Sequence, residues 1–271
     1  MRKWLVTIAV LGVCIVPLRA DITVVHTTTM EGAMAAMMPA GQLPKITMRI
    51  KGMKARADIE TAGMTVTSIT DLVARQVITL MPDGKTAQVI TPETVAAGGE
   101  GLALPGMNVS LKSTGKTQMI DGVSCDEHTL AVLLNMAELG GAQMPPEALA
   151  AMKDVKMMMN GSFWIAKSAP GAAEYVAFNK AAMDSKLFAA ISGMKPGESG
   201  GLDKLLEAAA AAPGILYLSE MTMRFEGTGP VVEAMKQMGD MKMVQKLTSI
   251  SADPIADDLF KLPEGYTIEK K

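Results

Sequence analysis

The clearest structural signal in this chain is an alternation of apolar and charged residues between Lys45 and Thr91. The apolar positions alternate with polar or charged ones before and after Gly52, at Ile46, Met48, Ile50 and Ile59. Because successive residues of a strand point to opposite faces, a period of two predicts antiparallel strands with one apolar face. We expect the charged face to be solvated and convex, and the apolar face to be the place where function lies.

The rest of the chain extends this sheet and adds helices. Strands are predicted over 22–29, 107–112, 118–120, 123–134, 156–167, 215–225, 241–251 and 266–269. Runs rich in Ala, Met and Leu predict helices over 30–40, 172–191 and 202–212, with shorter ones in 135–155, from Pro230 and from Asp253-Pro254. Asp121-Gly122 is a strong hairpin signal. The pattern is that of an α+β protein, in which a curved antiparallel sheet forms a half-open β-barrel beneath a helical lid.

The first 20 residues have the features of a secretory signal peptide. Arg2 and Lys3 precede an apolar run over 4–16, and Ala20 ends an acceptable cleavage site. The run is about 13 residues long, short of the roughly 20 that a membrane-spanning helix needs. We therefore expect a periplasmic or secreted protein with one domain over 21–271, no transmembrane span, and only peripheral association with the envelope.

Charge and cysteine content narrow the classes of function. Loss of the signal peptide would leave 23 basic residues against 28 acidic ones, a balance that argues against nucleic acid as a partner. Cys125 would be the single remaining cysteine, so no internal disulfide is expected. A chain of this length can bury a large core without one.

No pattern of residues indicates catalysis. His26 and His128 are the two histidines, and each falls in a predicted strand. Asp126, Glu127 and His128 are adjacent strand residues that face alternate ways, so the three cannot converge on one metal ion. The Gly-rich stretch 98–101 lacks the Lys-Ser/Thr of a phosphate-binding loop. We therefore expect no enzyme, no cofactor and no site built on these groups.

Methionine is the compositional outlier, with 25 residues. Flexible, polarizable thioethers suit an adaptable apolar core or cavity, which is the interpretation we favour. Thioethers also select Cu(I), so a copper-binding protein is an alternative. The sequence clusters that it would use are Met30, Met34, Met37 and Met38; Met157 to Met159; and Met235, Met238, Met241 and Met243.

Several segments resemble the LolA/LolB-like superfamily of lipoprotein carriers. The segment 52–60 fits a G-x-x-x-R-x-(D/E) strand through Gly52, Arg56 and Asp58. Further similar segments are 68–71, 81–85, 114–128, 163–167 and 260–266. The chain looks most like an uncharacterised family within that group. The resemblance implies a curved sheet, a helical lid and, between them, an apolar cavity that shelters acyl chains.

These observations together favour a non-enzymatic extracytoplasmic protein that binds a lipid, an acyl chain or a lipoprotein segment. The residues expected to line the cavity are Met34, Met37, Met38, Ile46, Met48, Ile50, Ile59, Leu216 and Leu218. Two alternatives stay open at this point. One is the methionine-based copper protein, and the other is a structural envelope protein with a filled core and no ligand.

Overall fold

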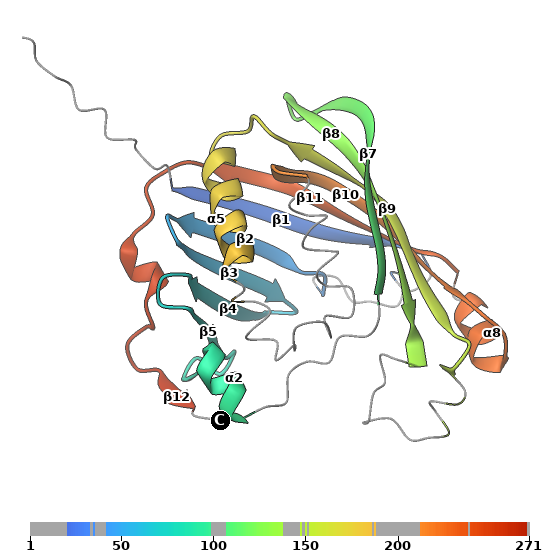
Figure 1. Ribbon diagram of the computed structural model, residues 1–271, viewed down its shortest axis with the longest axis horizontal. Coiled ribbons are helices and arrows are strands. Elements are labelled where there is room, and N and C mark those ends of the chain that lie inside the picture. The colour runs from blue at the N-terminus through green and yellow to red at the C-terminus, as the bar shows by residue number, and fades with distance from the viewer. Residues whose placement is uncertain are drawn as a thin grey trace, which may run out of the picture.

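One large curved sheet of 12 strands, which does not close into a barrel, dominates the protein (Figure 1). The computed structural model describes residues 21–32, 35, 42–98, 107–137, 147, 150, 152–185, 187, 212–237 and 239–269. The strand order is β12-β6-β5-β4-β3-β2-β1-β11-β10-β9-β8-β7. Neighbouring strands pair antiparallel, except that β12 runs parallel to β6. The predicted curved antiparallel sheet is therefore confirmed.

Two runs of strands build the sheet, and β1 and β11 join them at its centre. The first run contains β1 (Ile22–Glu31), β2 (Lys45–Lys51), β3 (Lys54–Thr61), β4 (Met64–Asp71), β5 (Gln76–Leu80) and β6 (Thr86–Ile90). The second contains β7 (Met107–Ile120), β8 (Val123–Asn135), β9 (Lys156–Ala166), β10 (Ile215–Glu226) and β11 (Met241–Ser251). The edge strand β12 spans Thr267–Glu269. The described helices are α2 (Pro92–Gly98), α5 (Ala172–Asp184), α8 (Pro230–Gln237) and the 3-10 helix η2 (Asp257–Phe260).

Short turns connect the hairpins at the predicted places. At the β7–β8 turn, Asp121 has φ 49° and Gly122 has φ 81°. A two-residue turn of this kind needs positive φ at both positions, which Asp and Gly tolerate best. Gly52 at the β2–β3 turn also has a positive φ, of 57°. The sequence thus fixes the register of these hairpins locally.

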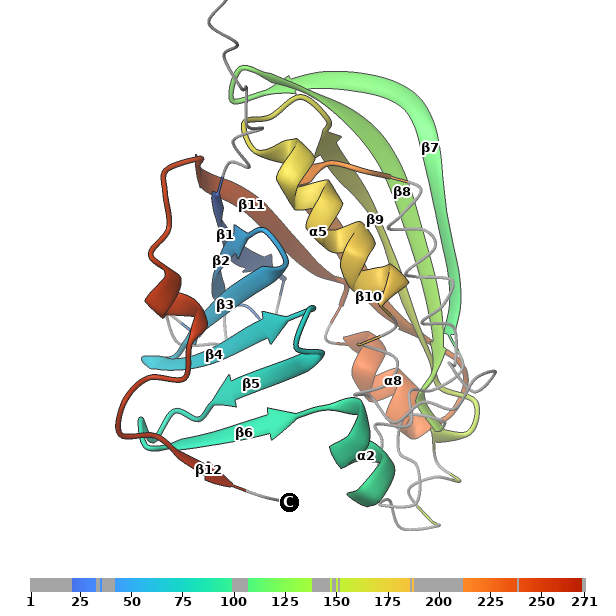
Figure 2. The same ribbon diagram turned by 60° about the vertical axis from the view of Figure 1, so that its left-hand side comes forward.

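Helix α5 covers part of the concave face of the sheet. Figure 2 shows it lying inside the curve, between the strands β1 to β3 and the strands β7 to β9. The side chains of Phe178 and Ala182 from α5 belong to one buried cluster with Ile22, Ile50 and Ala55 from the strands. Those three strand residues are cross-strand neighbours, so they share a face. The apolar face predicted from the alternation is therefore the face that α5 covers.

The C-terminal segment 252–266, which contains η2, covers the part of the convex face formed by β3 to β5. Ile255 and Phe260 of this segment pack against Ile69, Ile78 and Leu80 of β4 and β5 in a second buried cluster. The segment passes on the opposite side of the sheet from α5 (Figure 2). The expectation that this face is solvated is therefore wrong for the part that the C-terminal segment covers, whereas Lys45 and Glu60 on the same face are exposed.

A third buried cluster lies on β7 to β10. Its core is Leu130, Val132 and Leu134, with Phe163 and Met221 packed against it. Met221 crosses to β9 at Gly161, where a Cβ atom would lie 2.5 Å from the Met221 sulfur and 2.1 Å from the Glu220 carbonyl oxygen. Gly161 is therefore required by the close approach of β10.

Several predicted elements differ from the observed ones. A single bent strand, β7, replaces the two strands predicted over 107–112 and 118–120. β1 continues through Glu31, so Met30 lies in a strand and not in a helix. The C-terminal helix begins at Asp257 and not at Asp253, which instead pairs with the Ser251 hydroxyl. Most of the predicted helix over 30–40 and, except for Ala212, that over 202–212 lie outside the described residues.

Candidate functional site

The motif residues of the β3 strand form a buried polar network on the convex face. The Asp58 carboxylate is 8 % exposed and accepts hydrogen bonds from Arg49, from Arg56 and, at 2.6 Å, from the Thr67 hydroxyl. Arg56 also donates from Nη1 to the Leu259 carbonyl oxygen at 3.3 Å. Arg56 therefore connects the sheet to the C-terminal segment, which gives the motif a structural role.

Electrostatics favour the ionised form of Asp58. Burial raises the pKa of this carboxyl, but the hydrogen bonds from Arg56, Thr67 and Arg49 and the charge of Arg56 outweigh burial. The pKa of Asp58 therefore lies below its ordinary value of 3.8. A carboxylate held ionised in this way is a poor proton donor at neutral pH.

The two histidines and the cysteine do not assemble into a reactive centre. Nε2 of His26 donates to the Leu216 carbonyl oxygen at 2.9 Å, and burial lowers the pKa of this imidazole. Nδ1 of His128 is buried with no hydrogen-bond partner among the described residues. Burial raises the pKa of the Cys125 thiol, with the charges of Asp126 and Asp121 adding to it, so the reactive thiolate is disfavoured.

Within the described ranges, no three His, Cys, Asp or Glu side chains are placed to hold a metal ion together. Asp126 forms an ion pair with Lys167 instead, and Glu127 bonds to Thr114.

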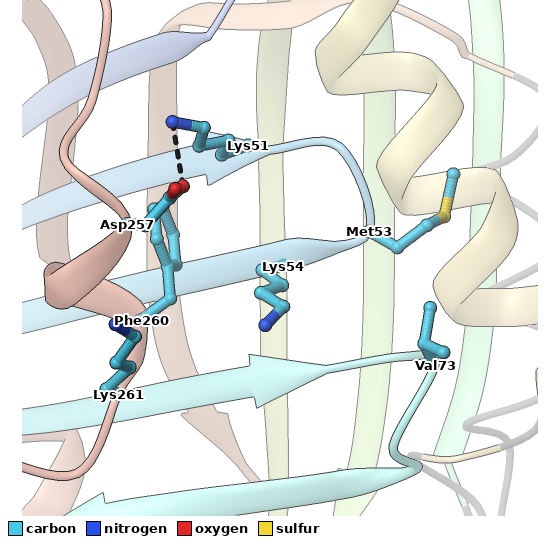
Figure 3. A pocket seen from close by; sticks show the side chains of 7 residues that line it. All are labelled: Lys51, Met53, Lys54, Val73, Asp257, Phe260 and Lys261. Carbon is cyan, nitrogen blue, oxygen red and sulfur yellow. Dashed lines mark ion pairs between the residues drawn. The ribbon is translucent and has the colours of Figure 1, made fainter.

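An open cleft of about 470 Å³ lies where the hairpin turns meet the C-terminal segment. Figure 3 shows Met53 and Val73 at one end of it, and Lys51, Lys261 and Phe260 near the other. The cleft carries three lysines, but each has an acidic partner. Lys51 pairs with Asp257 at 2.9 Å, Lys54 with Asp71 at 3.2 Å and Lys261 with Asp258 at 2.7 Å. Each lysine that lines the cleft therefore already has an acidic partner, and none of the three is available as an unpaired charge for an anion.

The predicted cavity residues fall into two groups on the concave face. Ile50 is 1 % exposed and Met48 packs against the cluster beneath α5, so both contribute to the core. Ile46 and Ile59 are direct cross-strand neighbours on the same face, but neither belongs to a core cluster of the described residues. Ile59 is 38 % exposed. This pair lies where α5 does not cover the sheet.

The remaining predicted residues are placed differently. Leu218 pairs with Lys246 of β11, which pairs with Thr27 of β1. Thr27 in turn pairs with Lys45, the residue before Ile46. The Leu218 side chain packs against the buried cluster beneath α5, so Leu218 contributes to the core. Leu216 lies beside a β-bulge and accepts the His26 hydrogen bond through its carbonyl. Met34, Met37 and Met38 lie outside the described residues.

The strand register adds apolar residues that the sequence did not single out as a cavity lining. Val66 pairs with Ile59 and is 37 % exposed. Met30 pairs with Met243, which is also 37 % exposed, and Met223 pairs with Met241. The alternation along β1 and β11 places these methionines on the same face as His26 and Ile46. The only sequence signal for this grouping is the alternation of methionine with a polar residue over 221–223 and over 241–243.

We call this surface the open apolar face, and it comprises Met30, Ile46, Ile59, Val66, Met223, Met241 and Met243. Each residue is half-buried or exposed, and none is packed into the three core clusters of the described chain. Scattered exposed apolar residues are ordinary, but a set gathered on one concave face makes this surface the candidate site.

The chain matches no protein-family model, and no curated protein is significantly similar to it in sequence. Among the described residues, the helices are too short or too polar to cross a membrane. The interpretation of the site therefore depends on the geometry alone.

Proposed function

We propose that this is a non-enzymatic extracytoplasmic protein of LolA-like fold that binds a hydrophobic ligand on the open apolar face. A lipid, an acyl chain or a lipoprotein segment fits this surface. The observation that supports the proposal is the division of the concave face: one part is filled by α5, and the other presents half-buried apolar side chains. The signal-peptide pattern of residues 1–20 supports the location.

The driving force would be removal of apolar surface from water. Each buried methylene contributes about 0.8 kcal/mol, so an acyl chain that covers several of these side chains gains enough to bind measurably. A curved sheet increases that gain, because a ligand on its concave side contacts several strands at once. The unclosed edges leave a route for a long chain to enter from the side.

The geometry changes the set of residues that we expect to contact the ligand. Ile46 and Ile59 remain in the set, and Val66 joins them on β4. Met48, Ile50 and Leu218 move to the core, because each belongs to or packs against the buried cluster beneath α5. The G-x-x-x-R-x-D segment contributes through the C-terminal segment that it anchors, and not through contact with ligand.

Extraction of the gently purified protein into organic solvent, with mass spectrometry of the extract, tests the proposal. We expect a co-purifying lipid, and we expect the delipidated protein to bind a fluorescent fatty acid. Ile59→Asp and Val66→Asp should weaken that binding, since each places a charge on the open apolar face. Val73→Asp is the matched control, because Val73 is 78 % exposed on a turn.

Absence of any extracted lipid together with no response of the fluorescent fatty acid would overturn the proposal. That result would favour the structural alternative, in which the concave face is filled and no ligand binds. Equal weakening by Val73→Asp and Ile59→Asp would also count against the open apolar face as the site.

A further inference from the structure

A second property of the open apolar face is the chemistry of its side chains on β10 and β11. Met221 pairs with Met243, and Met223 pairs with Met241, so four methionines occupy the corners of one rectangle on a single face. Opposite Cβ atoms are about 5 Å apart, and residues two apart along a strand are separated by about 7 Å. The centre of the rectangle thus lies about 4 Å from each Cβ, within reach of a thioether.

The four corners are not equivalent. The Met221 sulfur lies over Gly161 of β9 and packs into the third core cluster. Met223, Met241 and Met243 are packed into none of the described clusters, and Met243 is 37 % exposed. Met30 lies beside Met243 on β1 and adds a further thioether at the margin. Three thioethers outside the described core clusters therefore border one point on this face, and Met243 is the most exposed of them.

We propose that Met223, Met241 and Met243 form a binding site for Cu(I). Thioether sulfur is a soft ligand that selects monovalent copper over zinc, magnesium or calcium, which prefer imidazole, thiolate or oxygen. The next row of described residues on the same face is neutral and polar, with Thr28, Gln245 and Ser219, and places no cation beside the metal.

An apolar function alone does not explain these residue types. Strands favour β-branched and aromatic residues, and Val or Ile would supply the same apolar surface with better strand propensity. The copper proposal goes beyond the hydrophobic-ligand proposal and does not depend on it. It shares Met241 and Met243 with one cluster suggested by sequence proximity, but the strand register replaces Met235 and Met238 with Met223, about 20 positions away.

The test is an anaerobic titration of the protein with Cu(I) in competition with a chromophoric chelator. We expect one Cu(I) per chain, and weakening by at least about tenfold in the triple variant Met223→Leu, Met241→Leu and Met243→Leu. Leu conserves volume and apolarity, so the fold should persist in that variant, which circular dichroism checks. Ile59→Asp separates the two proposals, because it should weaken fatty-acid binding and leave the affinity for Cu(I) unchanged.

A matched triple variant, Met64→Leu, Met119→Leu and Met158→Leu, removes as many thioethers from elsewhere on the sheet. Met64 is 58 % and Met119 63 % exposed, and Met158 lies on the opposite face of β9 from Met159. Equal loss of Cu(I) affinity in both triple variants, or unchanged affinity in the first, would overturn the assignment.

Oxidative footprinting of the wild-type protein gives a result that does not depend on any variant. Ag(I), which is soft, monovalent and stable in air, replaces copper, and dilute hydrogen peroxide then oxidises accessible methionines to sulfoxides. Peptide mass spectrometry should find Met223, Met241 and Met243 protected by Ag(I), while Met64 and Met119 are oxidised as before. Uniform oxidation of all five with and without Ag(I) would refute the site.

Discussion

The Asp58 network makes the most specific prediction about stability. Asp58→Ala would remove the acceptor for Arg49, Arg56 and the Thr67 hydroxyl in a single change. The two guanidinium groups would then face each other across the place that the carboxylate now neutralises. Because Arg56 also holds the Leu259 carbonyl, we expect the C-terminal segment to loosen together with the sheet.

The magnitude follows from the burial of the partners. Hydrogen bonds to charged groups contribute about 1.5–3 kcal/mol each, but their sum overstates the effect because the partners relax. Removing one member of a buried ion pair destabilises by about 3–5 kcal/mol. The side chains of Arg49 and Arg56 are 28 % and 19 % exposed and can regain water. We therefore expect a loss at the lower end, about 3 kcal/mol, and about half of that for Asp58→Asn.

Urea denaturation monitored by circular dichroism measures this loss, and hydrogen exchange over residues 252–266 measures the loosening. The exposed ion pair of Asp257 with Lys51 supplies the control, since Asp257→Ala should change stability little. A loss below about 1 kcal/mol for Asp58→Ala, or a loss equal to that of the control, would refute the reasoning.

The same network predicts a pH dependence. Because the folded pKa of Asp58 is lowered, its contribution is fully present above the ordinary value of 3.8 and is lost as the pH falls through the folded pKa. Asp58→Asn should remove this part of the acid sensitivity. An acid transition of unchanged steepness in that variant would contradict the assignment.

Two further changes test other parts of the fold. Gly161→Ala places a Cβ 2.1 Å from the Glu220 carbonyl oxygen, so we expect about 2 kcal/mol of destabilisation in a thermal melt, against little change for Ser162→Ala beside it. Burial lowers the pKa of His26, so its contribution to stability should be complete above pH 6.5 and decline as the pH falls through the folded pKa. Denaturation at about pH 7.5 and about pH 5 should show a smaller difference for His26→Gln than for the wild type, and equal differences would exclude this role.

The local signals in the sequence were sufficient for most strands. Alternation over 45–60 predicted both the strands and the shared face of Ile46, Met48 and Ile50, because side-chain direction in a strand depends only on the period. The Asp121-Gly122 turn was predictable for the same reason, since it depends on two backbone angles. Each of these features is decided within a few residues.

What the sequence did not reveal depends on contacts between distant segments. Asp58 was assigned to a solvated face, and only the return of Leu259 and Phe260 over 200 residues later makes that face buried. Met243 and Met30 became neighbours through the pairing of β1 with β11, which no local pattern specifies. Leu218 looked suitable by composition, but its face depends on the register across three strand pairs.

The course of the C-terminal segment has a consequence for how the chain matures. The apolar convex side of β4 and β5 and the outer edge of β6 are completed by residues 255–269, more than 150 positions after those strands. Synthesis proceeds from the N-terminus. The early strands therefore expose an apolar surface and an unpaired edge until the last residues have been synthesised. During that interval the nascent chain avoids aggregation either by binding a chaperone or by rapid completion of folding. Truncated chains that end before Ile255 should therefore accumulate as aggregates.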